Sequence, residues 1–497
     1  MVLEQFTVSL GIVFLGNLFF LLFATLSFFG YLSLNKFLLI KNSDNSFLLI
    51  KFSLILMCFI IIGGIINFFF PISNTLVAVI YLFGFIIFIF KYKKKENIVE
   101  LKWIFFIYIF IALYLYNSGS NNDFGYHSHH ISLYKNYSLF NFNQNIEDIR
   151  VKYNSIFLLL NSITFHSDIF ISIKFLSAFI FALFIFDIKK FIEYNKNPNI
   201  LRSLSLFALI CFFLTLSKFK NIGTDYSAHL IYFSLILFYV SNNMLNRKFF
   251  ESKEFFFICC SIISLLVVLK ISMVLCSLIF LHYFFTIHKS NQFLKVFSFK
   301  LLLPFILVLI WIFQNFTLSK CIIYPLSQLC LLDEPLLRSV IFEHNMINLF
   351  AKSVKIDYWA TPIETLREMN SIFYWFSFWV NDHFWKISEK FVPSIILFFI
   401  LTYKLFSKSR AKLHIIENQN IFFLLIFLSL IIWFIQTPAM RFGFSYLVIN
   451  LFNLFILILN SLNIGFRDNL KENVFSRIFN FAIIFMIFYQ FIRISSF

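Results

Sequence analysis

Residues 48–70 read LLIKFSLILMCFIIIGGIINFFF, an apolar run in which Lys51 is the only charge. A helix of roughly 20 such residues crosses the hydrocarbon core of a bilayer. The rest of the chain is similar, because 60% of its 497 residues are hydrophobic and 13% are charged, against about 25% charged in soluble domains. A soluble core stops growing near ~250–300 residues. The sequence therefore predicts an all-α polytopic integral membrane protein, and it excludes a disordered chain.

Apolar runs of similar length recur along the chain and are too long for the ~10-residue strands of an outer-membrane barrel. We expect about fourteen transmembrane helices. They lie near residues 7–30, 48–70, 74–90, 101–116, 168–186, 201–217, 226–244, 255–268, 272–287, 301–316, 392–407, 420–435, 444–462 and 478–495.

The linkers 91–95, 187–190, 247–248, 288–289 and 408–410 are basic and fall between alternate pairs of these spans. The positive-inside rule places them in the cytoplasm. Topology then accounts for most of the net charge of +17, and no basic stripe remains to indicate nucleic-acid binding. Two long segments, near 117–167 and 317–391, face the outer side, and we expect interfacial helices in both.

The first outer loop begins NSGSNNDFGYHSHH, residues 117–130. Asp123 follows the end of a span closely, where a carboxylate can act as a general base or cap the helix that comes next. The amphipathic stretch 126–140 can lie along the membrane interface. The histidines that begin with His127 lack a paired acid or a second histidine cluster, so the sequence does not support a metal site.

Three further charges mark shorter outer turns. Asp225 is the only acid in the turn 218–225, where it either caps a helix or serves a site. Lys270 stands between two short spans, so it either reaches the outer interface with its ammonium or is buried beside an anionic partner. Arg441, in the turn QTPAMRFG at 436–443, either anchors the interface or holds a phosphate through its fixed fork of donors.

The second long loop opens with SKCIIYP at 319–325. Trp375 and Trp379 are one helical turn apart, which is typical of an interfacial helix in an aromatic belt. Cys321 and Cys330 are the only two cysteines outside the predicted spans, and they lie on the oxidising side. We expect them to form a disulfide that stabilises the loop by roughly 2–3 kcal/mol in the chain-entropy model.

The order of these motifs resembles the GT-C superfamily of membrane glycosyltransferases, in particular bacterial multi-spanning proteins associated with surface polysaccharides. The resemblance rests on DFGYHSHHISLY at 123–134 and on PAMRFG at 438–443, and it covers residues 101–465. It implies three regions, with accessory transmembrane helices at 1–100, a catalytic module at 101–465 and a final helix at 466–497. The Asp-x-Asp pair of the metal-dependent members is absent, so no cofactor is implied, and a divalent metal is not supported.

The resemblance implies an enzyme of the bacterial inner membrane that moves a sugar from a polyprenyl-phosphate donor to an acceptor hydroxyl on the periplasmic face. The acceptor is a glycan, a glycolipid or a protein, and direct attack inverts the anomeric carbon. The implied roles are a base at Asp123 and an orienting acid at Asp225. Substrate binding falls to Lys270, Arg441, Tyr126, His127 and Tyr324. A polysaccharide polymerase or ligase, and a lipid-linked sugar flippase or other transporter, stay open as alternatives.

Overall fold

The computed structural model describes most of the chain, and it shows an almost entirely helical protein. The described residues are 2–34, 47–92, 98–116, 131–141, 155–164, 174–194, 197–214, 224–288, 298–324, 326–352, 372–408, 413–414, 416–436, 438–466 and 473–495. Contacts divide the chain into two compact units, the first formed by Met1–Phe184, Lys218–Ser227 and Leu302–Tyr324, and the second by the remaining segments.

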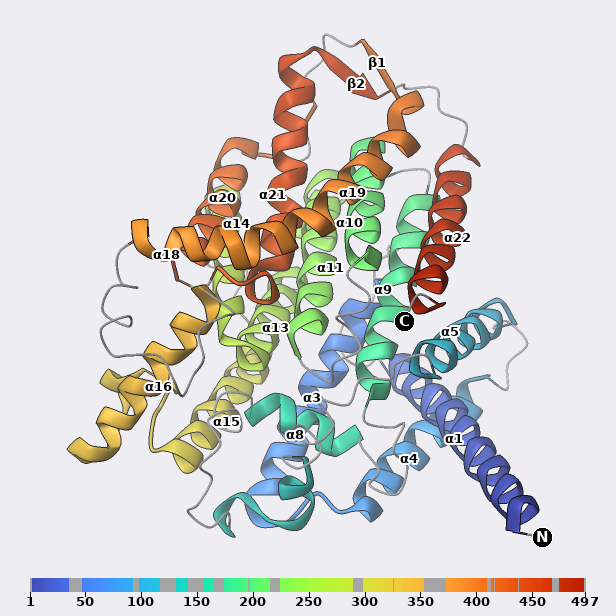
Figure 1. Cartoon of the computed structure of the whole chain (residues 1–497), viewed down its shortest axis with the longest axis vertical. Coiled ribbons are helices and arrows are strands. Elements are labelled where there is room, and N and C mark those ends of the chain that lie inside the picture. Colours follow the sequence, from blue (N-terminus) through green and yellow to red (C-terminus); the bar gives the residue numbers. More distant parts are fainter. Residues whose placement is uncertain are drawn as a thin grey trace. The chain divides into compact units, whose positions relative to one another are not determined.

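The first unit is built from long apolar helices near the N-terminus together with one later helix, as Figure 1 shows in blue, teal and yellow. Its helices are α1 (Val2–Ser33), α3 (Leu48–Phe69), α4 (Asn74–Tyr92), α5 (Ile98–Tyr116), α8 (Ser155–Thr164) and α15 (Leu302–Ser319), with the start of α9 (Phe175–Glu193) and of α11 (Thr224–Leu245).

Helices α1 and α4 approach each other closely at two glycines. A Cβ atom on Gly30 would lie 1.9 Å from the carbonyl oxygen of Gly84, so only glycine permits this crossing. The hydroxyls of Ser27 and Tyr31 donate to the carbonyls of Tyr81 and Ile80, each at 2.6 Å. Small residues and side-chain hydrogen bonds of this kind hold helices together in a bilayer, where apolar burial gives little driving force.

Part of the predicted amphipathic stretch 126–140 also belongs to the first unit. Residues 131–136 are helical, and Leu139–Asn141 form a 3₁₀ turn. Ile131, Tyr134 and Leu139 are fully buried, and the backbone N–H of Ile72 donates to the Tyr134 carbonyl at 2.9 Å. This face of the stretch therefore packs into the protein.

The second unit contains the helices that surround the later polar motifs (Figure 1). They are the rest of α9 and α11, α10 (Asn199–Leu214), α12 (Arg247–Phe250), α13 (Lys253–Leu269), α14 (Leu278–His288), α16 (Glu334–Lys352), α18 (Ile372–Trp379), α19 (Trp385–Thr402), α20 (Gln419–Gln436), α21 (Met440–Ser461) and α22 (Asn473–Ser495). Short 3₁₀ helices cover Ile271–Ser277, Phe299–Leu301, Ser327–Leu329 and Tyr403–Leu405.

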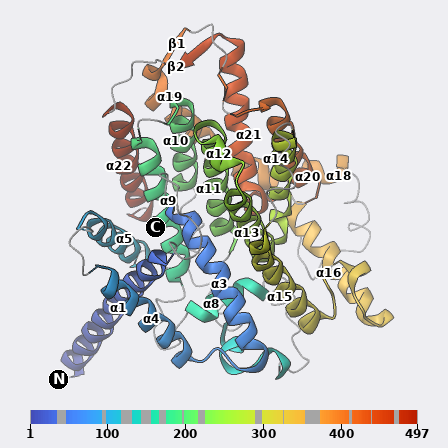
Figure 2. The same cartoon turned by 180° about the vertical axis from the view of Figure 1, so that it is seen from behind.

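Two short strands interrupt the helical fold. β1 (Phe406–Lys408) pairs antiparallel with β2 (Ile464–Phe466), with Ser407 opposite Gly465. Figure 2 shows the pair beside the C-terminal end of α21. The span predicted near 392–407 ends earlier than expected, because α19 stops at Thr402 and the chain passes through a 3₁₀ turn into β1.

Seven helices among the described residues are long and apolar enough to cross a membrane, by length and composition. They are Leu15–Ser33, Leu48–Phe69, Asn74–Lys91, Tyr226–Leu245, Phe299–Ser319, Gln419–Gln436 and Met440–Ser461. Four shorter apolar helices accompany them. These helices confirm the prediction of a polytopic all-α membrane protein, while the number of fourteen crossings stays a prediction.

Helices α16 and α18 lie within the predicted second outer loop. A π-helical turn, Val380–Phe384, joins α18 to α19. In Figure 1 this continuous orange helix runs across α20 and α21. Trp375 and Trp379 are both buried, so they pack within the protein and do not form an exposed aromatic belt.

The cysteines agree with the predicted redox pattern. Cys321 and Cys330 are both disulfide-bonded. The other five, in the predicted spans, are free thiols.

Candidate functional site

The start of α21 is a helix end whose backbone N–H groups have no side-chain partner at the cap. The helix begins at Met440, directly after Pro438 and Ala439. Ala439 occupies the cap position and has no side-chain oxygen to offer, although its backbone carbonyl accepts from the Phe442 N–H at 2.9 Å, and the first turn holds no acid. Such an end carries a partial positive charge and presents unpaired N–H groups. Arg441, in the same turn, adds a full positive charge that this helix end does not favour unless an anion is present.

Lys270 contributes a second cation to the start of α21. Its extended backbone (φ −157°, ψ 111°) ends α13 and precedes the 3₁₀ helix Ile271–Ser277, so the predicted turn between two short apolar segments is confirmed. Its ammonium donates to the backbone carbonyl of Arg441 at 2.6 Å. Lys270 is 3% exposed, so the alternative in which its ammonium reaches the outer interface is wrong.

His229, in α11, holds the same carbonyl from another side. Its Nε2 lies 3.0 Å from the Arg441 oxygen, and its Nδ1 lies 2.8 Å from the Ser445 hydroxyl. A carbonyl can only accept, so Nε2 carries the proton and Nδ1 accepts from Ser445. The Arg441 carbonyl thus accepts hydrogen bonds from both Lys270 and His229, which fix the first turn of α21 in place.

The two cations lie close to one aromatic ring. The Lys270 nitrogen and the Arg441 guanidinium carbon each lie 4.8 Å from the centroid of the Phe442 ring. Since each is 4.8 Å from the same point, the two charges are at most 9.6 Å apart. Arg441 is exposed, and no acid in the described part of the chain forms an ion pair with it. Arg441 and Lys270 therefore present one solvent-exposed cation and one buried cation at this helix end.

Two tryptophans anchor the turn that precedes α21. The indole N–H of Trp379 donates to the Pro438 carbonyl at 2.8 Å, and that of Trp433 donates to the Ala439 carbonyl at 3.2 Å. Gly443 makes room for the second indole, because a Cβ atom there would lie 2.2 Å from Cε2 of Trp433. The PAMRFG motif thus combines a turn, a cation, an aromatic platform and a close-packed glycine.

The π-helical turn Val380–Phe384 contains a histidine, His383, whose pKa is affected by the charge of Arg441. His383 is 8% exposed, and its Nε2 has no hydrogen-bond partner among the residues that the structure describes. Burial, together with the positive charges of Lys386 and Arg441, lowers the pKa of His383 to about 4, and the negative charge of Asp382 opposes this shift. The imidazole is therefore neutral at physiological pH and has a nitrogen that can accept a proton. Single-turn π-helices of this kind are frequent at functional sites.

The structure brings together two of the predicted site residues. Lys270 and Arg441 meet at the start of α21, although the contact uses the arginine's carbonyl and not its side chain. Asp225 lies in the first turn of α11. Tyr324 is buried and belongs to the first unit, whereas Lys270 and Arg441 belong to the second. Asp123, Tyr126 and His127 lie outside the described residues.

Sequence reasoning missed His229, His383, Ser445 and Trp433, and it assigned Trp379 to an interfacial helix and not to this site. One signal was available for His383, because Asn381, Asp382 and His383 form a polar break within an otherwise aromatic stretch. His229 gives no such signal, since its role arises only when α11 packs beside α21.

A family model described as a domain of unknown function, DUF8201, matches residues 12–448. The match includes Lys270, the π-helical turn and the first turns of α21. No curated protein and no solved structure matches the chain. Because the match covers most of the sequence, the chain belongs to the DUF8201 family.

Proposed function

We propose that the chain is a membrane glycosyltransferase that moves a sugar from a polyprenyl-phosphate donor to an acceptor hydroxyl on the outer face of the membrane. The observation that carries the proposal is the convergence of Lys270 and Arg441 on the uncapped start of α21. This helix end belongs to a segment apolar enough to cross a membrane. A phosphate attached to a lipid needs such a place, where fixed positive charge meets the edge of the bilayer.

The charges suit the chemistry of sugar transfer. The acceptor oxygen forms a bond to the anomeric carbon while the bond from that carbon to the phosphate oxygen breaks, and the electron pair leaves with the phosphate. Negative charge grows on the phosphate, and preorganised cations in a water-poor site stabilise it. Lys270 is already fixed by its hydrogen bond, and Arg441 is exposed and can close on the phosphate.

The acceptor proton needs a base. The resemblance implies Asp123 for this role, with Asp225 as an orienting acid. The described residues offer His383 as a further candidate, because its imidazole is neutral and acted on by the charge of Arg441. Activity that survives in folded Asp123→Asn and is lost in His383→Phe would assign the proton transfer to the histidine.

Equilibrium binding tests the phosphate site. Native mass spectrometry would compare a polyprenyl-phosphate sugar with the uncharged polyprenol of the same length. We expect Arg441→Gln to weaken binding of the phosphate lipid about tenfold to hundredfold, since a charge-assisted hydrogen bond contributes about 1.5–3 kcal/mol. Binding of the polyprenol should not change.

The matched control is Arg338→Gln, which removes an arginine that is 80% exposed on α16. Equal losses for Arg338→Gln and Arg441→Gln would mean that general surface charge, and not a site, attracts the lipid. Equal losses for the phosphate lipid and the polyprenol would also contradict the proposed phosphate contact.

A further inference from the structure

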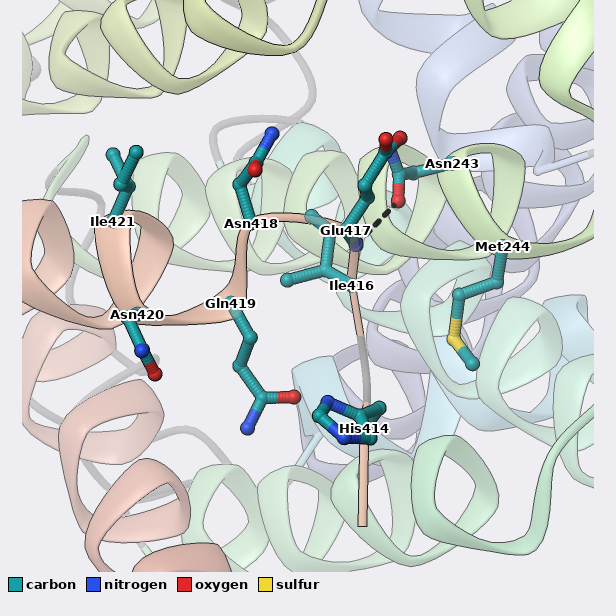
Figure 3. A pocket seen from close by; sticks show the side chains of 9 residues that line it. All are labelled: Asn243, Met244, His414, Ile416, Glu417, Asn418, Gln419, Asn420 and Ile421. Atoms are coloured by element: carbon teal, nitrogen blue, oxygen red, sulfur yellow. Dashed lines mark hydrogen bonds between the residues drawn. The ribbon is translucent and has the colours of Figure 1, made fainter. Parts of the chain in front are cut away.

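A second polar site lies at the other end of α11. A pocket of about 660 Å³ lies between the last turns of α11 and the segment that leads into α20. Figure 3 shows the side chains that line it. His229 and Asn243 are 14 residues apart on α11, which corresponds to roughly 21 Å along the helix axis. The pocket is therefore separate from the cationic site at the start of α21.

The lining of this pocket is rich in uncharged hydrogen-bonding groups. Four side-chain amides and one imidazole contribute donors and acceptors, and three apolar side chains complete the wall together with Glu417. The lining residues are Asn243, Met244, His414, Ile416, Glu417, Asn418, Gln419, Asn420 and Ile421. Among the residues that the structure describes, the lining holds neither lysine nor arginine, so these side chains supply no cation to a phosphate group.

The carboxylate of Glu417 is already engaged by an arginine that it shares with Glu251. Arg247 forms an ion pair with Glu417 and a second one with Glu251 at 2.6 Å. A ligand cation would have to compete with this arginine. The pocket therefore favours a neutral ligand that carries several hydroxyl groups, which bind amide donors and acceptors, and whose C–H faces contact Met244, Ile416 or Ile421.

A buried network holds the pocket in shape before any ligand binds. The backbone N–H of Glu417 donates to Oδ1 of Asn243 at 2.9 Å. His282 Nε2 donates to the Glu417 carbonyl at 2.8 Å, and the Tyr239 hydroxyl donates to His282 Nδ1 at 2.8 Å. Asn418 follows with a left-handed backbone, φ 53°, a conformation that costs free energy in a residue other than glycine. Preorganised polar groups of this kind reduce the entropy lost on binding.

The Asn243 amide also has an unused donor. Its oxygen is fixed by Glu417, so its orientation is determined, and its Nδ2 is buried without an acceptor among the described residues. An unsatisfied buried donor destabilises the protein, and a ligand oxygen that reaches it would relieve this cost.

We propose that this pocket binds a neutral polyhydroxylated ring, a sugar moiety, as a site separate from that of lipid-linked phosphate. The charge pattern places the pocket on the cytoplasmic side, next to the basic linker 247–248. The sugar can be free in solution or can be the headgroup of a lipid-linked sugar, and both sources present the same hydroxyl groups.

Site-specific cysteine protection tests the proposal in the full-length chain. His414→Cys and Asn420→Cys place a thiol at two exposed points of the pocket rim, so one reporter stays informative if the other substitution weakens binding. Modification by N-ethylmaleimide is followed at each peptide by mass spectrometry. One arm adds the methyl glycosides of glucose, galactose and N-acetylglucosamine, and the other adds polyprenyl-phosphate-linked sugar.

Occupancy at ten times Kd should slow labelling about tenfold at His414→Cys and Asn420→Cys but not at Arg338→Cys on α16. Protection by a methyl glycoside supports a free sugar, and protection by the lipid-linked compound alone supports a headgroup. Absence of protection in both arms, or equal protection at Arg338→Cys, would overturn the proposal. Repeating the assay in Arg441→Gln separates the two sites, because the protection should persist there even if the outer phosphate site fails.

Discussion

Gly443 should be among the positions of α21 least tolerant of substitution, and Gly443→Ala tests the packing that holds the candidate site. A Cβ atom at this position would lie 2.2 Å from Cε2 and 2.4 Å from Nε1 of Trp433. Ordinary van der Waals contact begins near 3.4 Å, so the indole must retreat by 3.4 − 2.2, or about 1.2 Å. Trp433 is 3% exposed and already hydrogen-bonded to Ala439 at 3.2 Å, which leaves it little freedom to move.

The expected loss of stability in Gly443→Ala follows from these contacts. Overpacking a close-packed site costs about 1–3 kcal/mol, and a broken indole hydrogen bond adds about 0.5–1.5 kcal/mol. Alanine in a helix recovers about 0.5–1 kcal/mol relative to glycine. We therefore expect a net destabilisation of about 1–3 kcal/mol. Since the shift in melting temperature per kcal/mol shrinks as chains become longer, this corresponds to a fall of roughly 2–5 °C.

The assay is the temperature at which half of the detergent-purified protein stays monodisperse after heating. Gly16→Ala is the matched control, because a Cβ atom on Gly16, in α1, meets nothing within 4 Å, and that variant should be as stable as wild type or slightly more so. In a Trp433→Leu background the cost of Gly443→Ala should disappear. Equal stability of Gly443→Ala and Gly16→Ala would refute this account of the packing.

Three further predictions concern charge and the disulfide. The pKa of His383 in the folded protein is about 4, below the ordinary value near 6.5. Because the unfolded chain takes up the proton first, the stability of the fold should fall as the pH drops from 6.5 to 4. His383→Phe should reduce this pH dependence, measured by thermal unfolding across the same range. Lys270→Met should change the melting temperature little, because the lost hydrogen bond is offset by relief from burying a charge, yet native mass spectrometry should show at least tenfold weaker binding of lipid phosphate. Cys330→Ser should lower stability by about 2–3 kcal/mol. Because Cys321 is buried, the thiol freed there should react with an alkylating reagent after denaturation, whereas denatured wild type purified without reductant should take up no reagent at either cysteine.

Much of the fold could be predicted because apolar runs report directly on membrane helices. The segment 48–70 became α3, and the break at Lys270 separates α13 from the following 3₁₀ helix, as expected. The distribution of basic linkers placed Cys321 and Cys330 on the oxidising outer side, and this predicted that both are disulfide-bonded. The interfacial helix with Trp375 and Trp379 was harder, because the sequence does not reveal that α20 and the turn before α21 bury both indoles.

The candidate site could be predicted only in part, because its contacts depend on tertiary packing. Lys270 and Arg441 stood out as isolated charges, but no sequence pattern indicates that they share the ring of Phe442. His229 and Ser445 are 216 positions apart, and their hydrogen bond exists only because α11 packs against α21. His383 is a candidate base because it is buried within a π-helical turn, a local geometry that hydrophobic periodicity does not encode.

Transfer itself tests the central claim most directly. The purified chain is incubated with a panel of polyprenyl-phosphate-linked radiolabelled sugars and an extract of envelope glycans and glycolipids, and both the labelled acceptor and the released polyprenyl phosphate are quantified. Wild type and Arg338→Gln should each form the two products in equal amounts. Arg441→Gln should transfer about 10²–10³ times more slowly, the loss typical of removing one electrostatic stabiliser. Wild-type protein that binds the donors yet forms neither product, or Arg441→Gln protein that transfers at the wild-type rate, would contradict the claim.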